Sequence, residues 1–245
     1  MRLNKYLSDA GVCSRREADR LTEAGEITVN GKRAETGMQV ESGDVVVVKG
    51  KTVVPEEKKV YLAFNKPRGI VCTAEKREKN NVIDYLSYPV RIYPVGRLDK
   101  DSEGLLLMTN DGAIVNGIMR ARNRHEKEYQ VEVNKEITPE FLKKMASGVP
   151  ILDTVTRPCE IFQTGKKSFR IILTQGLNRQ IRRMCEYLGY RVIRLKRIRV
   201  MNIQLGDLPV GTYREVTSEE KKVLFSMIQN SSNTTVRYKG DKHAK

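Results

Sequence analysis

The beginning of the chain alternates between helical and strand-like hydrophobic patterns. Apolar residues recur at helical spacing over 3–10, and the capping-box sequence Ser14-Arg15-Arg16-Glu17 predicts the start of a second helix. Two-residue alternation predicts strands over 27–29, before the turn dipeptide Asn30-Gly31, and over 45–48. We therefore expect a small module of two helices and short strands over 1–50.

The longer remainder of the chain mixes strand and helix patterns. A change to proline and mixed charge over 51–59 predicts a linker, and the body is expected over 60–230. Because strands and helices do not alternate strictly, we expect an α+β fold with a largely antiparallel or mixed sheet flanked by helices. Residues 231–245 are expected to form a disordered basic tail. The predicted strands are 60–64, 70–73, 105–109, 129–133, 159–162 and 169–174, and the predicted helices are 112–120, 139–147, 179–188 and 218–229.

Composition and charge narrow the class of protein. The chain has 245 residues, of which 39% are hydrophobic, and this is enough for a buried core. No apolar run approaches the roughly 18 residues of a membrane helix, and no secretory signal precedes the first helix, so we expect a cytoplasmic protein. Forty-five Lys and Arg against 30 Asp and Glu leave a net charge of +15. This charge favours nucleic acid as the partner, and a basic solubilising surface is the alternative.

Motifs for metals and cofactors are missing from the sequence. Cys13, Cys72, Cys159 and Cys185 lie far apart without CxxC spacing, so we expect reduced core residues rather than a zinc site or disulfides. The chain has two histidines, and neither GxxxxGK[ST] nor GxGxxG occurs. We therefore expect no metal and no cofactor, and any chemistry should use carboxylates, Tyr, Lys and Arg.

Two groups of basic residues are candidates for RNA contact. Residues 1–50 carry eight basic and eight acidic side chains, yet basic residues gather in the second helix and after the turn. Between Asn178 and Arg199, eight basic residues face one acid, Glu186. Either group can meet phosphates, and a solvated surface is the alternative for each. The grouped residues of the front module are Arg15, Arg16, Arg20, Lys32 and Arg33.

The second basic group begins with an amphipathic helix. Its apolar spacing predicts a helix over 179–188, with Asn178 as the N-cap. On a helical wheel, Arg179 and Arg183 lie opposite the apolar face, where they can reach solvent or phosphate. Arg182 lies nearer the edge of the apolar face and is placed to turn toward a buried partner. The alternative is that all three arginines lie on a solvent-exposed face of the helix.

A polar loop bounded by glycines, 96–104, leads into the apolar strand 105–109, and such loops commonly present reactive groups. Asp99 lies between Arg97 and Lys100, whose positive charge would keep its carboxylate ionised as a nucleophile or base. Composition alone does not rank Asp99 above its acidic neighbours, and a turn or capping role is the alternative for all of them. These neighbours are Asp101, Glu103 and Asp111.

Several motifs resemble one known family. The body resembles the RsuA-type rRNA pseudouridine synthases in Asn65-Lys66-Pro67 with Gly69, in Gly96-Arg97-Leu98-Asp99 with Ser102-Glu103-Gly104, in Lys127-Glu128-Tyr129 and in Arg179-Gln180-Ile181-Arg182-Arg183-Met184. The front module resembles an S4 RNA-binding domain in Leu3-Asn4-Lys5-Tyr6-Leu7 and Val29-Asn30-Gly31-Lys32. His125-Glu126-Lys127 and Gly148-Val149-Pro150 look like the RluF branch, which acts on large-subunit (23S) rRNA.

The resemblance implies an S4-like module followed by a catalytic domain that isomerises uridine to pseudouridine. It implies the essential aspartate at Asp99, the active-site tyrosine at Tyr129 and the aspartate-pairing arginine at Arg182. Without the resemblance, Tyr129 would be read as a strand tyrosine packed in the core. The reaction breaks the N1–C1′ bond and joins C5 to C1′ without redox change, so neither cofactor nor metal is needed.

The expected partner is 23S rRNA, free or in a ribosome assembly intermediate. Its uridine must be turned out of the stack at a cost of a few kcal/mol, which phosphate contacts should offset. Two alternatives remain, namely the same chemistry on tRNA and a non-catalytic S4-type ribosome-assembly factor. A monomer is the default expectation. The candidate phosphate contacts are Arg97, Arg179, Arg183, the basic strand 191–199 and the grouped residues of the front module.

Overall fold

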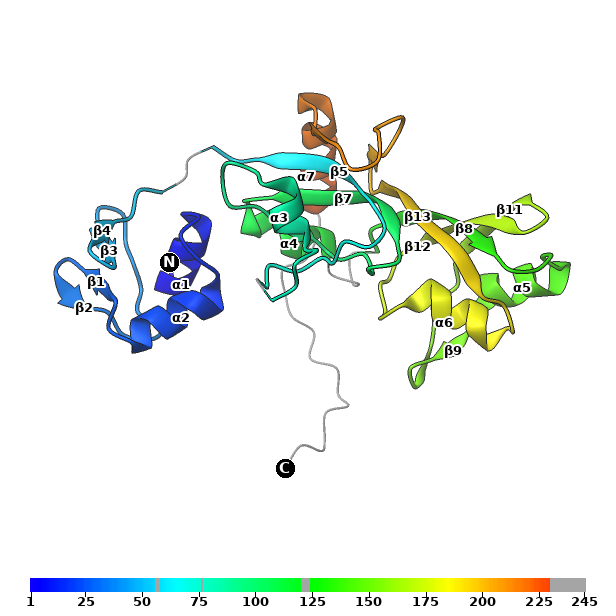
Figure 1. The fold of residues 1–245 in the computed structure, drawn as a ribbon, viewed down its shortest axis with the longest axis horizontal. Coiled ribbons are helices and arrows are strands. Elements are labelled where there is room, and N and C mark those ends of the chain that lie inside the picture. The colour runs from blue at the N-terminus through cyan, green and yellow to red at the C-terminus, as the bar shows by residue number, and fades with distance from the viewer. Residues whose placement is uncertain (56–57, 76, 120–123, 230–245) are drawn as a thin grey trace. The chain divides into compact units, whose positions relative to one another are not determined.

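Figure 1 shows the fold in the computed structural model, which describes all residues except 56–57, 76, 120–123 and 230–245. The chain forms two compact units, which we describe separately. Unit 1 comprises Met1–Gly112 and Leu208–Glu215, and unit 2 comprises Ala113–Asp207 and the residues from Val216 onward. The chain therefore passes between the units three times. The predicted tail, 231–245, lies outside the described residues.

The front module of unit 1 has the predicted elements. Its two helices, α1 (Leu3–Asp9) and α2 (Arg15–Glu23), and its sheet share one apolar core. The Ser14 hydroxyl accepts a hydrogen bond from the Glu17 amide (3.2 Å), but the Glu17 carboxylate pairs with Arg20 rather than completing the capping box. The sheet has the order β2-β1-β3-β4, with β1 (Ile27–Val29), β2 (Lys32–Arg33), β3 (Val46–Val48) and β4 (Lys51–Thr52).

Two turns explain the shape of this sheet. Asn30 and Gly31 both have positive φ (50° and 75°), as the two-residue turn between β1 and β2 requires. Lys49 and Gly50 connect β3 to β4 with the same combination of positive φ angles. The sheet therefore extends through Lys51–Thr52, two residues into the segment predicted as a linker.

The rest of unit 1 is an antiparallel sheet. β5 (Tyr61–Lys66) pairs with β7 (Glu103–Thr109) and with β15 (Tyr213–Glu215), and β6 (Tyr93–Val95) also pairs with β7. All seven residues of β7 are buried, as its continuous apolar sequence predicts. The strand expected over 70–73 is wrong, because Val71 forms only an isolated bridge with Asn81, whose side chain caps the short helix α3 (Val82–Leu86).

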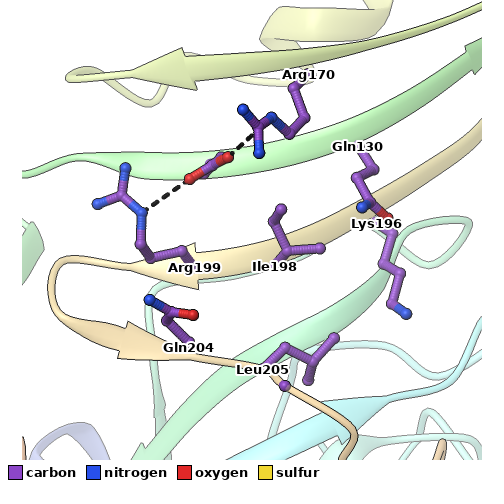
Figure 2. A pocket seen from close by; sticks show the side chains of 9 residues that line it. Gln130, Arg170, Lys196, Ile198, Arg199, Gln204 and Leu205 are labelled. Atoms are coloured by element: carbon purple, nitrogen blue, oxygen red, sulfur yellow. Dashed lines mark hydrogen bonds and ion pairs between the residues drawn. The ribbon is translucent and has the colours of Figure 1, made fainter. Parts of the chain in front are cut away.

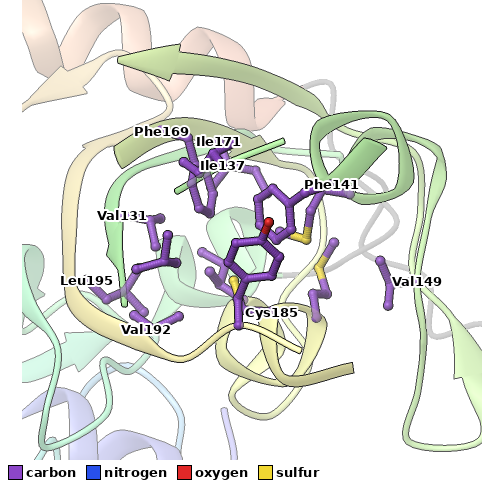
Figure 3. Packing of buried hydrophobic residues seen from close by; sticks show 14 of the residues in the cluster. Val131, Ile137, Phe141, Val149, Phe169, Ile171, Cys185, Val192 and Leu195 are labelled. Atoms are coloured by element: carbon purple, nitrogen blue, oxygen red, sulfur yellow. The ribbon is translucent and has the colours of Figure 1, made fainter. Parts of the chain in front are cut away.

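The sheet strands of unit 2 pair antiparallel in the order β11-β12-β8-β13, with β14 paired to β13. One face of this sheet carries charged side chains around a hollow (Figure 2), and the other face is covered by a hydrophobic core (Figure 3). The strands are β8 (Lys127–Val133), β11 (Glu160–Gly165), β12 (Ser168–Leu173), β13 (Val192–Val200) and β14 (Ile203–Gln204).

The core of unit 2 lies between the sheet and two helices. Phe141 from α5 (Pro139–Ser147) contacts Phe169 and Tyr190 edge-on or tilted, with ring centroids 5.6 and 4.2 Å apart. Met184 and Cys185 from α6 (Gln180–Tyr187) are fully buried in the same core. The hairpin β9 (Pro150–Ile151) and β10 (Thr154–Val155) packs against α6, and the remaining helices are α4 (Gly112–Met119) and α7 (Ser218–Gln229).

The helix starts in unit 2 partly correct the predictions. Thr138, directly before the predicted helix 139–147, caps α5, since its hydroxyl accepts a hydrogen bond from the Phe141 amide (3.1 Å). The predicted cap Asn178 is wrong for α6, because Arg179 occupies the N-cap in a left-handed conformation. Thr217, one residue before the predicted start, caps α7 through reciprocal hydrogen bonds with Glu220 (2.9 and 3.1 Å).

The predicted fold class is confirmed. Helices accompany sheets whose strand pairings are antiparallel within both units, which is the expected α+β arrangement. No helix within the described residues is long and apolar enough to span a membrane.

Candidate active site

The loop that carries Asp99 joins β6 to β7 in unit 1. Asp99 is half-buried, and its carbonyl accepts a hydrogen bond from the Ser102 amide (3.0 Å). Gly96 and Gly104 lie at the two ends of the loop, with φ angles of 76° and 100°, which residues other than glycine rarely adopt. The loop therefore has a fixed local conformation rather than an open one.

The upstream motif around Lys66 fastens the Asp99 loop. Lys66 is fully buried, and its ammonium donates hydrogen bonds to the carbonyls of Pro67 (2.9 Å) and Ser102 (2.8 Å). The Gly69 amide donates to the carbonyl of Lys100 (2.8 Å), the residue directly after Asp99. The backbone that follows Asp99 is thus tied at two points to one motif, a role that the sequence reasoning did not assign to Lys66.

Tyr129 lies on β8 in unit 2. Its side chain is half-buried and packs against the hydrophobic core, on the face of the sheet that α5 and α6 cover. In the sheet it stands opposite Ile171 of β12 and Arg197 of β13. A phenol at this position has one side on the core and one side accessible, so the strand-tyrosine reading and a contact with a base are both compatible with its placement.

Lys127 shares this face of β8 with Tyr129, because they are two residues apart. Only 7% of Lys127 is exposed, and burial, with a smaller contribution from the positive charge of Arg197, lowers the pKa of its ammonium to about 8. A buried cation beside Tyr129 makes this part of the sheet electropositive.

Helix α6 presents its arginines as the helical wheel predicts. Arg182 is 8% exposed and turns inward, whereas Arg179 is exposed. Arg183 is half-buried and folds back on the loop before the helix, donating to the carbonyl and the side-chain oxygen of Asn178 (3.1 and 3.3 Å). The prediction that Arg182 is the inward-facing arginine is confirmed.

The sequence reasoning missed a charged cluster on the opposite face of the sheet. Glu128 bridges Arg170 and Arg199, at 3.3 and 2.9 Å (Figure 2). Arg199 also pairs with Glu126 at 3.0 Å. Glu128 is next to Tyr129 in the chain but points to the other face. Strand alternation alone could have placed Glu128 there, but its partners come from strands far apart in sequence.

In the front module, the candidate phosphate-binding side chains differ in the contacts that they already make within the protein. Arg15, Arg16 and Lys32 are exposed. Arg20 pairs with Glu17, and Arg33 donates to the Glu23 carbonyl (3.3 Å). Arg20 and Arg33 are also exposed, so all five can meet RNA, but these two must first leave their partners. Arg97, on the Asp99 loop of unit 1, is also exposed.

The predicted catalytic residues divide between the units. Asp99 belongs to unit 1, while Tyr129 and Arg182 belong to unit 2, on elements that enclose one core. The four cysteines are free thiols, two buried and two half-buried, as expected of core residues. Among the described residues, no cluster of His, Cys, Asp and Glu could hold a metal ion.

Comparison with known proteins defines the class. A family model for RNA pseudouridylate synthases matches residues 60–187, and an S4 domain model matches residues 1–46. The chain belongs to the RNA pseudouridylate synthase family and carries an S4 domain. It is therefore an RNA-modifying isomerase.

Particular relatives refine this assignment. The chain is 53% identical to the dual-specificity RNA pseudouridine synthase RluF of Salmonella typhi, over 95% of this chain and 81% of the relative. It is 36% identical to the ribosomal large subunit pseudouridine synthase B of Bacillus subtilis, over 95% and 98% of the two chains. A crystal structure of a pseudouridylate synthase matches with a TM-score of 0.68 and 25% identity, covering 91% of this chain and 99% of that chain.

Proposed function

We propose that this pseudouridine synthase isomerises a uridine in large-subunit (23S) rRNA, with Asp99, Tyr129 and Arg182 as its catalytic set. The observation that carries the substrate proposal is the 53% identity, across 95% of the chain, to an RluF-type enzyme. The relative named for the large ribosomal subunit supports the same substrate. The reaction would take place in the cytoplasm, on free rRNA or an assembly intermediate, with the chain acting as a monomer.

The proposed mechanism begins with the Asp99 carboxylate. It attacks C1′ or removes a proton from the sugar, and either step breaks the N1–C1′ bond, so that uracil leaves C1′ and can turn to join it through C5. Tyr129 stacks on the base and helps remove the C5 proton. Arg182 holds the Asp99 carboxylate charged and oriented, because a guanidinium can donate two parallel hydrogen bonds to a carboxylate. The fastened backbone around Asp99 and the inward turn of Arg182 support these roles.

Binding energy must offset the cost of turning the uridine out of its stack, a few kcal/mol. We assign phosphate contacts to Arg97 and Arg179, which are exposed, and to the basic strand that includes Arg191 and Arg194. Arg183 joins these phosphate-contacting residues once its hydrogen bonds to Asn178 break. The S4 domain contributes the second surface, so RNA shape read by two modules selects the site.

The RluF relatives are dual-specificity RNA pseudouridine synthases, which supports a second RNA substrate for this chain, and tRNA is the candidate that the sequence left open. The same active site would serve both RNAs if each presents its uridine in a similarly folded loop. The family assignment sets aside the non-catalytic assembly factor that the sequence left open.

The test is carbodiimide mapping of pseudouridines in rRNA and tRNA from a deletion strain. Complementation uses the parent chain, Asp99→Asn or Asp99→Ala. We expect a mark in large-subunit rRNA that the parent restores and neither variant restores, although both purified variants still bind the RNA. Loss of a tRNA mark alone would replace the rRNA assignment, and loss in both would establish dual specificity. Normal turnover by Asp99→Ala would refute the catalytic set.

The S4 domain has its own test. Replacing Arg15 and Arg16 by Gln should weaken RNA binding and reduce the slope of log affinity against log salt by about 0.7 per lost phosphate contact. A matched control is Lys143→Gln, which removes an exposed positive charge from α5 in unit 2. An unchanged salt slope for the Arg15 and Arg16 variant would remove this helix from the RNA contact.

A further inference from the structure

We propose that Glu128 is a positioning residue for pseudouridylation. Its buried carboxylate fixes the register of β13 against β8 and thereby sets the place of Tyr129 on the opposite face of the sheet. The inference rests on the proposed role of Tyr129. It concerns a residue that does not touch the reacting nucleoside, because Glu128 points away from the face on which Tyr129 lies.

Glu128 connects three strands at one point. It is 8% exposed on β8, and its two carboxylate oxygens pair with the Nε atoms of Arg170 on β12 (3.3 Å) and Arg199 on β13 (2.9 Å). Arg199 is itself held by Glu126 (3.0 Å) and by the carbonyl of Met201 (2.9 Å). Figure 2 shows the side chains of Arg170 and Arg199 converging on the carboxylate between them. The three strands are therefore cross-linked beside Tyr129.

This cross-link lies at a defect in the sheet. The register of β13 on β8 shifts between Arg197, which is opposite Tyr129, and Arg199, which is opposite Glu128. The extra residue, Ile198, lines the hollow on the same face as Lys196 and Arg199. Arg197 is 2% exposed, and Val200 returns to the buried side. A bulge here interrupts the alternation, and it lets two consecutive residues face the same way.

A bulged strand needs something that defines its register. Sliding a strand by one residue moves every side chain to the other face. Such a slip of β13 would carry Arg197 away from its place opposite Tyr129. The bond from Arg199 to Glu128 lies immediately beyond the bulge, so it opposes that slip more directly than any contact further along the strand. Hydrogen bonds between a carboxylate and a guanidinium are directional, so a carboxylate buried between two guanidiniums fixes their orientation as well as attracting them.

The alternative for this hollow is an anion site, and its charges do not favour one. The hollow has a volume of about 350 Å³ and is lined by Arg170, Lys196 and Arg199. Two of these three cations are already paired with carboxylates, of Glu128 and of Glu126. Only Lys196 adds uncompensated charge, so the cluster fits an internal cross-link better than a phosphate-binding pocket.

The experiment compares Glu128→Gln with Glu132→Gln. Glu132 lies on the same strand and the same face but is exposed, so its variant controls for charge. We measure kcat and KM on the substrate RNA, RNA affinity and the thermal midpoint, with kinetics run well below that midpoint. For Glu128→Gln we expect kcat to fall about 10- to 100-fold, as for partners that orient a functional group, with unchanged RNA affinity. Glu132→Gln should match the parent.

Arg199→Lys covers the case in which Glu128→Gln does not fold. A lysine keeps the charge but cannot hold Glu128, Glu126 and the Met201 carbonyl at the same time, so kcat should fall at least about fivefold. A role in folding alone would lower the thermal midpoint and leave kcat intact, and this result overturns the inference. A loss of activity that is explained by a parallel loss of RNA affinity also overturns the inference.

Tyr129→Phe separates this inference from the proposed function. If Tyr129→Phe loses turnover while folded Glu128 and Arg199 variants retain it, the positioning role fails and the catalytic set stands. If Tyr129→Phe keeps full turnover, the proposed role of Tyr129 fails first, and the positioning role fails with it.

Discussion

The two units hold their shares of the proposed catalytic set by different means. In unit 1, Asp99 sits on a loop whose backbone is tied by amides and by the buried ammonium of Lys66. In unit 2, Tyr129 and Arg182 project from a strand and a helix that pack on a shared hydrophobic core. The loop depends on a few polar contacts, whereas the strand and the helix depend on many apolar ones.

This difference predicts how each side fails. Polar contacts to a loop are directional, so losing one misplaces Asp99 without unfolding the unit. Apolar packing is distributed, so single core changes in unit 2 should lower stability before they lower turnover. Charged groups on unit 2, by contrast, can be removed with the core intact.

Arg182→Leu should show the largest effect. If Arg182 orients the Asp99 carboxylate, turnover should fall about 100- to 1000-fold, the range for removal of a preorganised charged group from an active site. RNA affinity should change little, because Arg182 is 8% exposed and turned away from solvent. Single-turnover kinetics and a binding isotherm measure the two quantities.

Arg183→Leu is the matched control for Arg182→Leu, since Arg183 is the next residue of α6 and is half-buried rather than buried. It should weaken RNA binding and leave single-turnover chemistry nearly intact. If Arg182→Leu lowers RNA affinity but not turnover, the proposed role of Arg182 in orienting the Asp99 carboxylate is wrong.

Lys66→Met tests the polar support of the Asp99 loop. The variant removes both hydrogen bonds to the carbonyls of Pro67 and Ser102, and we expect kcat to fall about 10- to 100-fold. Amide hydrogen exchange over 96–104 should become faster, while exchange in the unit 2 core stays slow. Arg68→Met, at an exposed neighbouring position, should leave both unchanged. If amide hydrogen exchange over 96–104 is unchanged in Lys66→Met, the loop conformation does not depend on the Lys66 hydrogen bonds.

Lys127→Met tests the buried charge of unit 2 through pH. The folded pKa of Lys127, about 8, lies below its ordinary value of 10.5, so between these values the unfolded chain holds a proton that the folded chain lacks. Stability from this group therefore rises as pH increases from 8 to 10.5, and below pH 8 the folded state carries the full cost of burying the charge.

Lys127→Met should consequently be more stable than the parent at pH 7, by up to about 3 kcal/mol. This advantage should shrink as pH approaches 10.5. Denaturant unfolding of both chains at several pH values measures the difference. A gap that does not change with pH would mean that Lys127 titrates normally.

The smallest effect concerns backbone strain beside α6. Leu152 and Asp153 form the two-residue turn of the β9–β10 hairpin with φ angles of 49° and 57°, which disfavour leucine. Leu152→Asn should stabilise the protein by about 0.5 kcal/mol and leave turnover unchanged. The loop of unit 1 places glycines at its two positive φ angles, so an equal gain is not available there. Destabilisation by Leu152→Asn would show that the exposed leucine makes a contact that outweighs the strain.

Much of the fold could be predicted from the sequence because its strongest signals are local. The capping residues Ser14 and Thr138, the turn Asn30-Gly31 and the continuous apolar strand before Thr109 all depend on neighbours in the chain. The strand expected over 70–73 failed because its alternating residues serve a loop that bridges to Asn81, and no local pattern distinguishes these cases.

The candidate site was predicted in part for the same reason. The helical period alone placed Arg182 inward, and this was correct. The functions of Lys66 and Glu128 depend on partners 36 and 71 residues away, so no local pattern signalled them. Asp99 could be singled out only by resemblance, since its carboxylate is chemically the same as those of its acidic neighbours.

The path of the chain has a consequence for synthesis. Unit 1 receives its edge strand β15 only after the first segment of unit 2, Ala113–Asp207, has been translated, because Leu208–Glu215 belongs to unit 1 and follows Asp207. During translation, β5 therefore waits with one side unpaired while the ribosome adds more than a hundred residues. Neither unit can be expressed whole as one uninterrupted segment of the natural sequence, so a single split of the chain divides at least one unit between the two fragments.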